Sequence, residues 1–361
     1  MTFDLEPIFG FTPDASSPLV VAGPCSAESA EQVMQTARSV ARCGVKVFRA
    51  GAWKPRTRPG QFEGVGEKAL PWLKRVQSET GMIPMVEVAT SSHLRMALRS
   101  GIDAFWIGAR TSANPFAVQE IADTLAELTE EKRVRITMLV KNPVNPDLEL
   151  WIGALQRIYQ AGVHRLGAVL RGFTSYGEHL YRNIPEWRIA FELHRRIPHL
   201  PLLCDPSHIA GRRDLVSPLA RQAICMGFDG LVIEVHCRPD DALSDAAQQI
   251  TPGQLAGLMT ELKSGCSTAD VCGLDALRSE IDDIDDGLMS LLSRRMSVAR
   301  EIGELKQSAN IPVVQPDRYK KLMEQRLSQA ERLDLSDEFV KKIFSVLHEE
   351  SVRQQVNLRD K

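Results

Sequence analysis

The stretch Phe48-Arg49-Ala50-Gly51-Ala52-Trp53-Lys54-Pro55-Arg56-Thr57 joins the end of an apolar strand to a cluster of cations. Val45 to Phe48 predicts the strand, and Pro55 removes a backbone donor soon after it. Arginine binds phosphate or carboxylate through a planar fork, whereas lysine is a compact charge, so the mixture suits a substrate with several anionic groups. The alternative is a solvated charged turn. Trp53 and two prolines favour a binding site, because they stiffen the segment.

Eight apolar runs of this kind lie between residues 18 and 250, separated by helical stretches. The predicted strands are Leu19–Ala22, Val45–Phe48, Ile83–Val88, Ala104–Ile107, Ile136–Val140, Arg165–Leu170, Pro201–Cys204 and Gly230–Val235. Helices such as Ala30–Arg42 and Gly153–Gln160 supply the crossovers that parallel strands need. The alternation predicts an α/β protein with a (β/α)₈ TIM barrel. A doubly wound open sheet is the alternative, which strand counting does not exclude.

Polar residues follow the predicted strands, at the carboxyl ends where (β/α)₈ barrels have their active sites. Cations follow strands two, four, five and six, and candidate metal ligands follow strands one, seven and eight. Cys25, His208 and Glu234 offer a thiolate, an imidazole and a carboxylate, and Asp245 could complete the set. Such a mixed set suits a borderline divalent transition ion. The alternative for each is structural, as a small apolar filler or a hydrogen-bonded core group.

Composition limits the kinds of partner that the chain can have. In 361 residues, 44 lysines and arginines stand against 46 acidic residues, a net charge of -2, so no nucleic-acid-binding surface is expected. The N-terminus carries Asp4 and Glu6 and no long apolar run, so neither a signal peptide nor a membrane span is expected. Seven cysteines without close paired spacing fit a reducing compartment. These features predict a cytoplasmic protein.

Seven motifs, in the order in which they occur along the chain, together resemble the type I 3-deoxy-D-arabino-heptulosonate 7-phosphate (DAHP) synthases. The beta subgroup is the most similar. They are Gly23-Pro24-Cys25-Ser26, Lys54-Pro55-Arg56-Thr57, Ile107-Gly108-Ala109-Arg110, Lys141-Asn142-Pro143, Leu170-Arg171-Gly172, Asp205-Pro206-Ser207-His208 and Glu234-Val235-His236. The match covers about residues 18–250. The resemblance implies condensation of phosphoenolpyruvate with erythrose 4-phosphate in the shikimate pathway. The related condensation with arabinose 5-phosphate, which makes an octulosonate, is the alternative, and the Lys54–Thr57 motif argues against it.

The same resemblance implies a role for each polar residue at the barrel mouth. Phosphoenolpyruvate would be held by Arg49, Lys54, Arg110, Lys141 and Arg171. The aldose phosphate would be held by Arg56 and Thr57, with Asp205 nearby. The metal ligands would be Cys25, His208, Glu234 and Asp245, with manganese, iron or cobalt as suitable divalent ions. Lys54 and His208 would also act at the reacting centre.

Residues 251–272 predict a last barrel helix and then a linker. The expected domains are a barrel at 1–263, a linker at 264–273, a helical domain at 274–356 and a tail at 357–361. Apolar residues at alternating steps of three and four predict a long amphipathic helix over about 273–306. Two further helices are predicted near Asp317–Ala330 and from Ser336 to about Val356. They are too short to cover the first helix, so an intertwined homodimer is expected.

Polar residues interrupt the apolar stripes of these helices. Arg295 takes a seam position, Lys306 lies on the same side of the helix, and Ser351 and Gln355 form an i, i+4 pair. The pattern fits equally a dimerisation hairpin whose polar groups set register and a polar ligand pocket.

Further motifs resemble the all-helical class of chorismate mutases over about residues 274–356. They are Leu277-Arg278, Arg295, Gly303 with Lys306, Asp317-Arg318, and Glu350-Ser351 with Gln354-Gln355. The resemblance implies rearrangement of chorismate to prephenate, with Arg278 reaching across the dimer. Arg278 and Arg295 would hold the two carboxylates, Lys306 and Gln355 the ether oxygen, with Arg318 and Ser351 in support. Tyr319 and Gln315 depart from the pattern, because acidic residues are common at both places.

The fusion of two such domains suggests a form of control. Fewer than about twenty residues precede the first predicted strand, too few for an independent domain. Feedback by chorismate or prephenate is therefore expected to act through the helical domain. A noncatalytic sensor or dimerisation module is the alternative for this segment.

Overall fold

The structure is a computed structural model that describes residues 3–10, 18–54, 60–177, 180–263 and 271–357. For Lys263 and for residues 271–280, 282 and 283 it describes the backbone alone. The chain divides into two compact units, residues 1–267 and 268–361.

The first unit is a closed barrel of eight parallel strands in sequence order. The strands are β1 Leu19–Gly23, β2 Val47–Arg49, β3 Ile83–Val88, β4 Ala104–Ile107, β5 Thr137–Lys141, β6 Arg165–Leu170, β7 Leu202–Cys204 and β8 Gly230–Glu234. Strand β1 pairs with β8 from Leu19 opposite Gly230 to Gly23 opposite Glu234. This pairing closes the sheet, so the predicted TIM barrel is confirmed and the open sheet is excluded.

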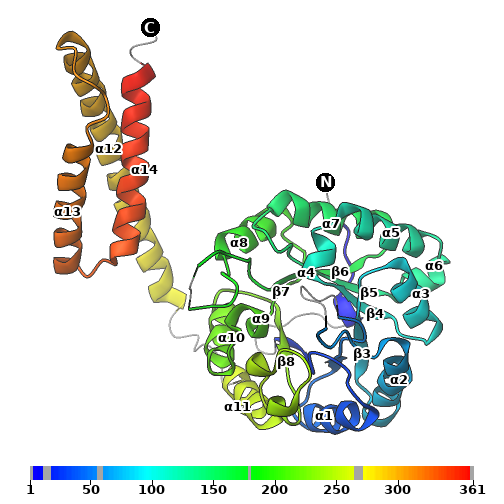
Figure 1. The fold of residues 1–361 in the computed structure, drawn as a ribbon. Helices are drawn as coiled ribbons and strands as arrows, with labels where there is room; N and C mark the ends of the chain where they lie inside the picture. Colours follow the sequence, from blue (N-terminus) through cyan, green and yellow to red (C-terminus); the bar gives the residue numbers. More distant parts are fainter. Residues whose placement is uncertain (1–2, 11–17, 55–59, 178–179, 264–270, 358–361) are drawn as a thin grey trace. The chain divides into compact units, whose positions relative to one another are not determined.

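Helices surround the barrel, as Figure 1 shows. They are α1 Ala30–Arg42, α2 Ala69–Thr80, α3 Ser91–Arg99, α4 Ala109–Ser112, α5 Pro115–Ala126, α6 Glu130–Arg133, α7 Leu148–Gln160, α8 Trp187–Arg196, α9 Pro206–Ala210, α10 Val216–Cys225 and α11 Pro252–Lys263. Several begin at a side-chain cap: Ser29 accepts a hydrogen bond from the Gln32 amide before α1, and Asp147 accepts one from the Leu150 amide before α7. The caps fix where each helix leaves its loop at the barrel rim.

The core of the barrel has two layers, because side chains alternate along each strand. Val20 and Ala22 face the surrounding helices, whereas Val21 belongs to the cluster that fills the barrel interior. Ile8 and Phe9 join this inner cluster, and the Phe9 amide donates to Thr137 Oγ1 at 3.2 Å. Apolar side chains therefore pack the interior, and the polar residues collect at the carboxyl ends of the strands.

The second unit contains three helices, α12 Val271–Ser308, α13 Pro316–Arg332 and α14 Asp337–Asn357. These bounds agree closely with the three helices predicted from the apolar periodicity, and α14 packs against both of the others. Many apolar side chains of α12 remain exposed, including Leu288, Leu291 and Leu305. Among the described residues, we find no helix with both the length and the apolar character needed to cross a membrane.

Candidate active sites

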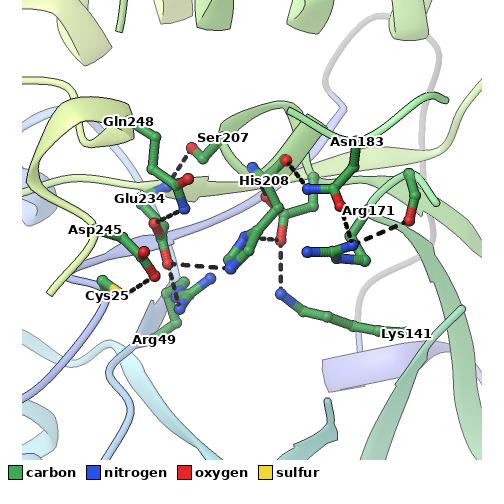
Figure 2. Close-up of polar contacts among 12 residues, drawn as sticks. Cys25, Arg49, Lys141, Arg171, Asn183, Ser207, His208, Glu234, Asp245 and Gln248 are labelled. Atoms are coloured by element: carbon green, nitrogen blue, oxygen red, sulfur yellow. Dashed lines mark hydrogen bonds and ion pairs between the residues drawn. The ribbon is translucent and has the colours of Figure 1, made fainter. Parts of the chain in front are cut away.

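A thiol and two carboxylates converge at the barrel mouth. The potential ligand atoms of Cys25, Glu234 and Asp245 all lie within 4.8 Å of one another. Cys25 Sγ donates to Asp245 Oδ2 at 3.3 Å, a contact visible in Figure 2. Burial and the nearby Glu234 raise the pKa of the Cys25 thiol to about 12. A bound cation would reverse this effect and stabilise the thiolate, so the donor set fits a divalent transition ion.

His208 lies next to this group, oriented by a neighbouring carboxylate. Its Nδ1 is 2.8 Å from Asp205 Oδ2, and its Nε2 is 3.7 Å from Glu234 Oε1. Burial lowers the pKa of His208 despite the attraction of Asp205, and so favours the neutral ring. A neutral imidazole whose other nitrogen faces a carboxylate is the usual arrangement of a metal-binding histidine. His208 Nε2 therefore lies beside Glu234, but the group of mutually close donor atoms, Cys25, Glu234 and Asp245, does not include it.

Arg49 is a buried cation that has hydrogen-bond donors available for a ligand. Its side chain is 1% exposed, Nη2 donates to Glu234 Oε1 at 3.1 Å, and the guanidinium lies over the Trp106 ring at 4.8 Å. Its Nε and Nη1 have no hydrogen-bond partner within the described part of the chain. Buried donors of this kind need acceptors, because an unsatisfied polar group costs about 1–3 kcal/mol. An anionic ligand would supply them.

Lys141 and Arg171 extend the cationic surface. Lys141 Nζ donates to Asp205 Oδ2 at 2.6 Å, and Arg171 Nη1 donates to Asn183 Oδ1 at 2.8 Å. Burial lowers the pKa of Arg171 to about 10, so the guanidinium remains charged at pH 7. Burial alone would raise the pKa of Asp205, but His208 and Lys141 outweigh it and hold that pKa well below its usual range. Asp205 is thus an anion between two cationic or proton-donating groups.

One pocket brings the predicted phosphoenolpyruvate residues together. It has a volume of about 80 Å³, and its walls include Arg49, Lys54, Arg110, Lys141 and Arg171. Asp245 and His208 also line it, so the cations share this cavity with two of the four candidate metal ligands. Arg56 and Thr57 lie outside the described residues.

Three residues that contact the candidate site residues escaped the sequence prediction. Gln248 Nε2 donates to Glu234 Oε2 at 2.6 Å, Asn183 lies between Arg171 and His208, and Arg182 Nη1 donates to Asp245 Oδ1 at 3.1 Å. Gln248 stands three residues after Asp245, a spacing that could have suggested it. Arg182 and Asn183 lie in a long loop and carry no local pattern.

The helical unit has a pocket of its own, of about 580 Å³, formed by all three helices. Arg294, Arg295, Lys306, Arg318 and His348 line it, and its described walls include no carboxylate. The Tyr319 and His348 rings are in contact in a tilted arrangement, with centroids 4.3 Å apart and an interplanar angle of 35°. Such a pocket suits an anionic ligand of moderate size.

The predicted polar residues of this unit meet in that pocket. Arg295 Nη1 donates to Ser351 Oγ at 2.6 Å and to Leu347 O at 3.0 Å, and Lys306 Nζ donates to Val313 O at 2.7 Å. Gln355 is 7% exposed, and its Oε1 has no partner among the described residues. The backbone at Arg278 belongs to α12, but its side chain lies outside the described part.

Comparisons with known proteins agree with this arrangement. Residues 12–268 match the DAHP synthetase I family, and residues 277–356 match the chorismate mutase type II family. A phospho-2-dehydro-3-deoxyheptonate aldolase of Thermotoga maritima is 34% identical over 255 residues, covering 71% of this chain and 71% of that protein. A 2-dehydro-3-deoxyphosphooctonate aldolase of Desulfotalea psychrophila is 27% identical over 263 residues, covering 68% of this chain and 88% of that protein.

Solved structures share the barrel. The crystal structure of the DAHP synthase of Thermotoga maritima gives a TM-score of 0.61 at 32% identity, covering 69% of each chain. A truncated form of the 3-deoxy-D-arabino-heptulosonate 7-phosphate synthase from that organism gives 0.59 at 31% identity, covering 69% of this chain and 86% of that one. With the closed barrel and its polar mouth, these matches show that the chain belongs to the DAHP synthetase I family and is an enzyme that also carries a chorismate mutase type II domain.

Proposed function

We propose that the barrel is a cytoplasmic, metal-dependent DAHP synthase of the beta subgroup, and that the helical domain rearranges chorismate to prephenate. The observation that carries the first part is the cavity that five cations share with His208 and Asp245, next to the Cys25, Glu234 and Asp245 group. The proposed division of the chain is a barrel at 1–263, a linker at 264–273, the helical domain at 274–356 and a tail at 357–361. The two reactions would stand at separate steps of the shikimate pathway.

In the barrel, phosphoenolpyruvate is assigned to Arg49, Lys54, Arg110, Lys141 and Arg171. The buried, unpartnered donors of Arg49 support this assignment, since they suit a carboxylate or phosphate oxygen. Erythrose 4-phosphate is assigned to Arg56 and Thr57, with Asp205 nearby. The condensation forms a bond between C3 of the enol and the aldehyde carbon, water adds at C2, and phosphate leaves by C–O cleavage.

The metal donors are assigned to Cys25, His208, Glu234 and Asp245. When bound, a divalent ion such as manganese, iron or cobalt would supply Lewis acidity to polarise the aldehyde. Lys54 lines the same cavity and is placed to stabilise negative charge that develops during the attack. Asp205 holds His208 through Nδ1, which leaves Nε2 directed at the donor set.

The choice of sugar tests this assignment against the octulosonate alternative. We expect the purified chain to consume phosphoenolpyruvate at least about tenfold faster with erythrose 4-phosphate than with arabinose 5-phosphate, a discrimination of about 1.4 kcal/mol. Phosphate release can be followed with each sugar at equal concentration. Faster turnover of arabinose 5-phosphate would overturn the DAHP assignment and leave the metal site intact.

In the helical domain, the two carboxylates of chorismate are assigned to Arg295 and to Arg278 from a second copy. Lys306 and Gln355 are assigned to the ether oxygen, and Arg318 and Ser351 support the site. The wholly cationic charge of the described pocket walls supports a dicarboxylate ligand. The residues would hold the reactive conformer and stabilise charge on the breaking ether bond, without a covalent intermediate.

A second copy of the chain is the proposed cover for α12. Its side chains Ile281, Leu288, Leu291 and Leu305 are 48–69% exposed within one copy. Apolar residues repeated along so long a helix match an interface between copies. We therefore propose a homodimer through the helical domain, with chorismate or prephenate bound there restraining the barrel.

Removal of the helical domain tests both the dimer and the feedback. Truncation after Gly265 is expected to convert the dimer to a monomer in light scattering, and to abolish the inhibition of DAHP formation by added prephenate. Feedback inhibition requires that the ligand bind two states of the enzyme with different affinities. The truncated chain would lack the proposed effector site, because that site lies in the helical domain. An unchanged number of subunits would contradict a dimer through the helical domain, and full-length enzyme whose DAHP formation responds to neither chorismate nor prephenate would contradict the feedback.

A further inference from the structure

The adjacent residues Arg182 and Asn183 contact both halves of the barrel site. They lie in the long loop between β6 and α8, just before Ile184, which exchanges backbone hydrogen bonds of 2.7 and 2.9 Å with Phe173. That exchange fixes the loop end beside β6, which carries Arg171 immediately after its last residue. We call this dipeptide the 182–183 bridge.

Asn183 joins the anion-binding side to the histidine. Its Oδ1 accepts a hydrogen bond from Arg171 Nη1 at 2.8 Å, and its Nδ2 donates to the backbone oxygen of His208 at 2.6 Å. The side chain is 5% exposed, so water does not compete freely for either bond. Figure 2 shows Asn183 between these two residues. A shift of Arg171 is therefore transmitted to the segment that carries His208.

Arg182 joins the same bridge to the carboxylates. Its Nη1 donates to Asp245 Oδ1 at 3.1 Å and to Gln248 Oε1 at 2.8 Å. Gln248 in turn donates through Nε2 to Glu234 Oε2 at 2.6 Å. One arginine thus orients two of the proposed metal ligands, one directly and one through an amide.

The backbone around the bridge is built to hold it closely. The Arg182 and Asn183 amides donate to Ala210 O and Ile209 O at 3.3 and 3.2 Å, next to His208 in α9. Gly211 has φ +68°, and a Cβ there would stand 2.4 Å from Arg182 Cβ. Gly172 has φ +77°, and a Cβ there would stand 2.8 Å from Asn183 Cβ. Both positions therefore require glycine, in conformation and in space.

We propose that the 182–183 bridge is a positioning element that couples the anion site to the metal site, so that phosphoenolpyruvate and the divalent ion each strengthen the binding of the other. Hydrogen bonds to ligating groups set their orientation and the affinity for metal. Coupling between two sites is reciprocal, because it is a property of the equilibrium. The inference rests on the proposed metal-dependent condensation.

Calorimetry on the full-length, chelator-treated chain tests the coupling without turnover. The dissociation constant of phosphoenolpyruvate is measured with and without Mn²⁺, and that of Mn²⁺ with and without phosphoenolpyruvate. In the unsubstituted enzyme, each ligand is expected to lower the dissociation constant of the other at least about fivefold. In Asn183→Ala, the ratio of the dissociation constants measured without and with the second ligand is expected to fall to within about twofold of one. Arg182→Gln is expected to weaken the binding of Mn²⁺ about 10–100-fold and to have a smaller effect on the binding of phosphoenolpyruvate.

Arg188→Gln is the matched control, because Arg188 lies nearby, is 88% exposed and pairs with Glu186 instead. It is expected to keep both affinities and the coupling. If Asn183→Ala does not unfold cooperatively, Arg182→Gln decides the test, since that side chain is half exposed. Unchanged coupling and Mn²⁺ affinity in a folded variant would overturn the inference. Failure of the unsubstituted enzyme to bind Mn²⁺ or another divalent transition ion would instead overturn the proposed metal dependence.

Discussion

Cys25→Ala is expected to lower the rate of DAHP formation by at least about 10²-fold and to remove stoichiometric binding of the divalent ion. The substitution takes away the only sulfur ligand of the proposed set and leaves an incomplete group of donors for a transition ion. Metal content is measured by elemental analysis after dialysis, and activity by loss of phosphoenolpyruvate. Chelation of the unsubstituted enzyme is expected to cause the same loss, reversed by added Mn²⁺.

Cys43→Ala is the control for this substitution. Its thiol is half-buried and donates to the backbone oxygens of Ser39 and Pro252, on the outer side of the barrel core. Activity and metal content are expected to stay within about twofold of the original values, because no proposed ligand is touched. A Cys25→Ala enzyme that retained its metal and its rate would contradict the assignment of the donor set.

Arg295→Ala is expected to lower the rate of chorismate loss by about 10²–10³-fold, an effect of the size seen when one positioned donor is removed from an active site, because the substrate carboxylate would lose its partner. Arg295 donates to Ser351 and Leu347 from the wall of the pocket, so its guanidinium is already held in place without ligand. The loss of chorismate is followed by absorbance with the full-length chain.

Arg300→Ala is the matched control, because Arg300 lies on the same helix and donates instead to Gln354 at the surface. Its rate is expected to equal that of the unsubstituted enzyme. If the unsubstituted chain itself shows no loss above the uncatalysed rate, the helical domain is a ligand-sensing or dimerisation module. Tyr319 and Gln315 would then be the residues to restore to acids.

The barrel site was predictable mainly from the polar residues that directly follow the apolar strands. In β3, β4 and β6 the apolar run alone predicted the bounds that the structure shows. Parallel strands of a barrel share one carboxyl edge, so polar residues that follow different strands must meet there. Cys25, His208, Glu234 and the five cations were therefore predictable as neighbours despite separations of up to about two hundred residues.

The supporting contacts were not predictable in the same way. Arg182 and Asn183 lie in a loop whose path depends on Gly172, Gly211 and the pairing of Phe173 with Ile184. No periodicity marks such residues, because a loop side chain is selected by one contact and not by a repeated face. In the helical unit, the heptad-like pattern predicted the helices, but the contact between the Tyr319 and His348 rings depends on how α13 and α14 pack.

The most direct test of two active sites on one chain is to assay both reactions on the same three proteins. The unsubstituted enzyme is expected to catalyse DAHP formation and chorismate loss. Cys25→Ala is expected to lose the first reaction and keep the second, and Arg295→Ala is expected to do the reverse when no effector is present. Parallel loss of both reactions in either folded variant, or the absence of one reaction from the unsubstituted enzyme, would contradict two independent sites.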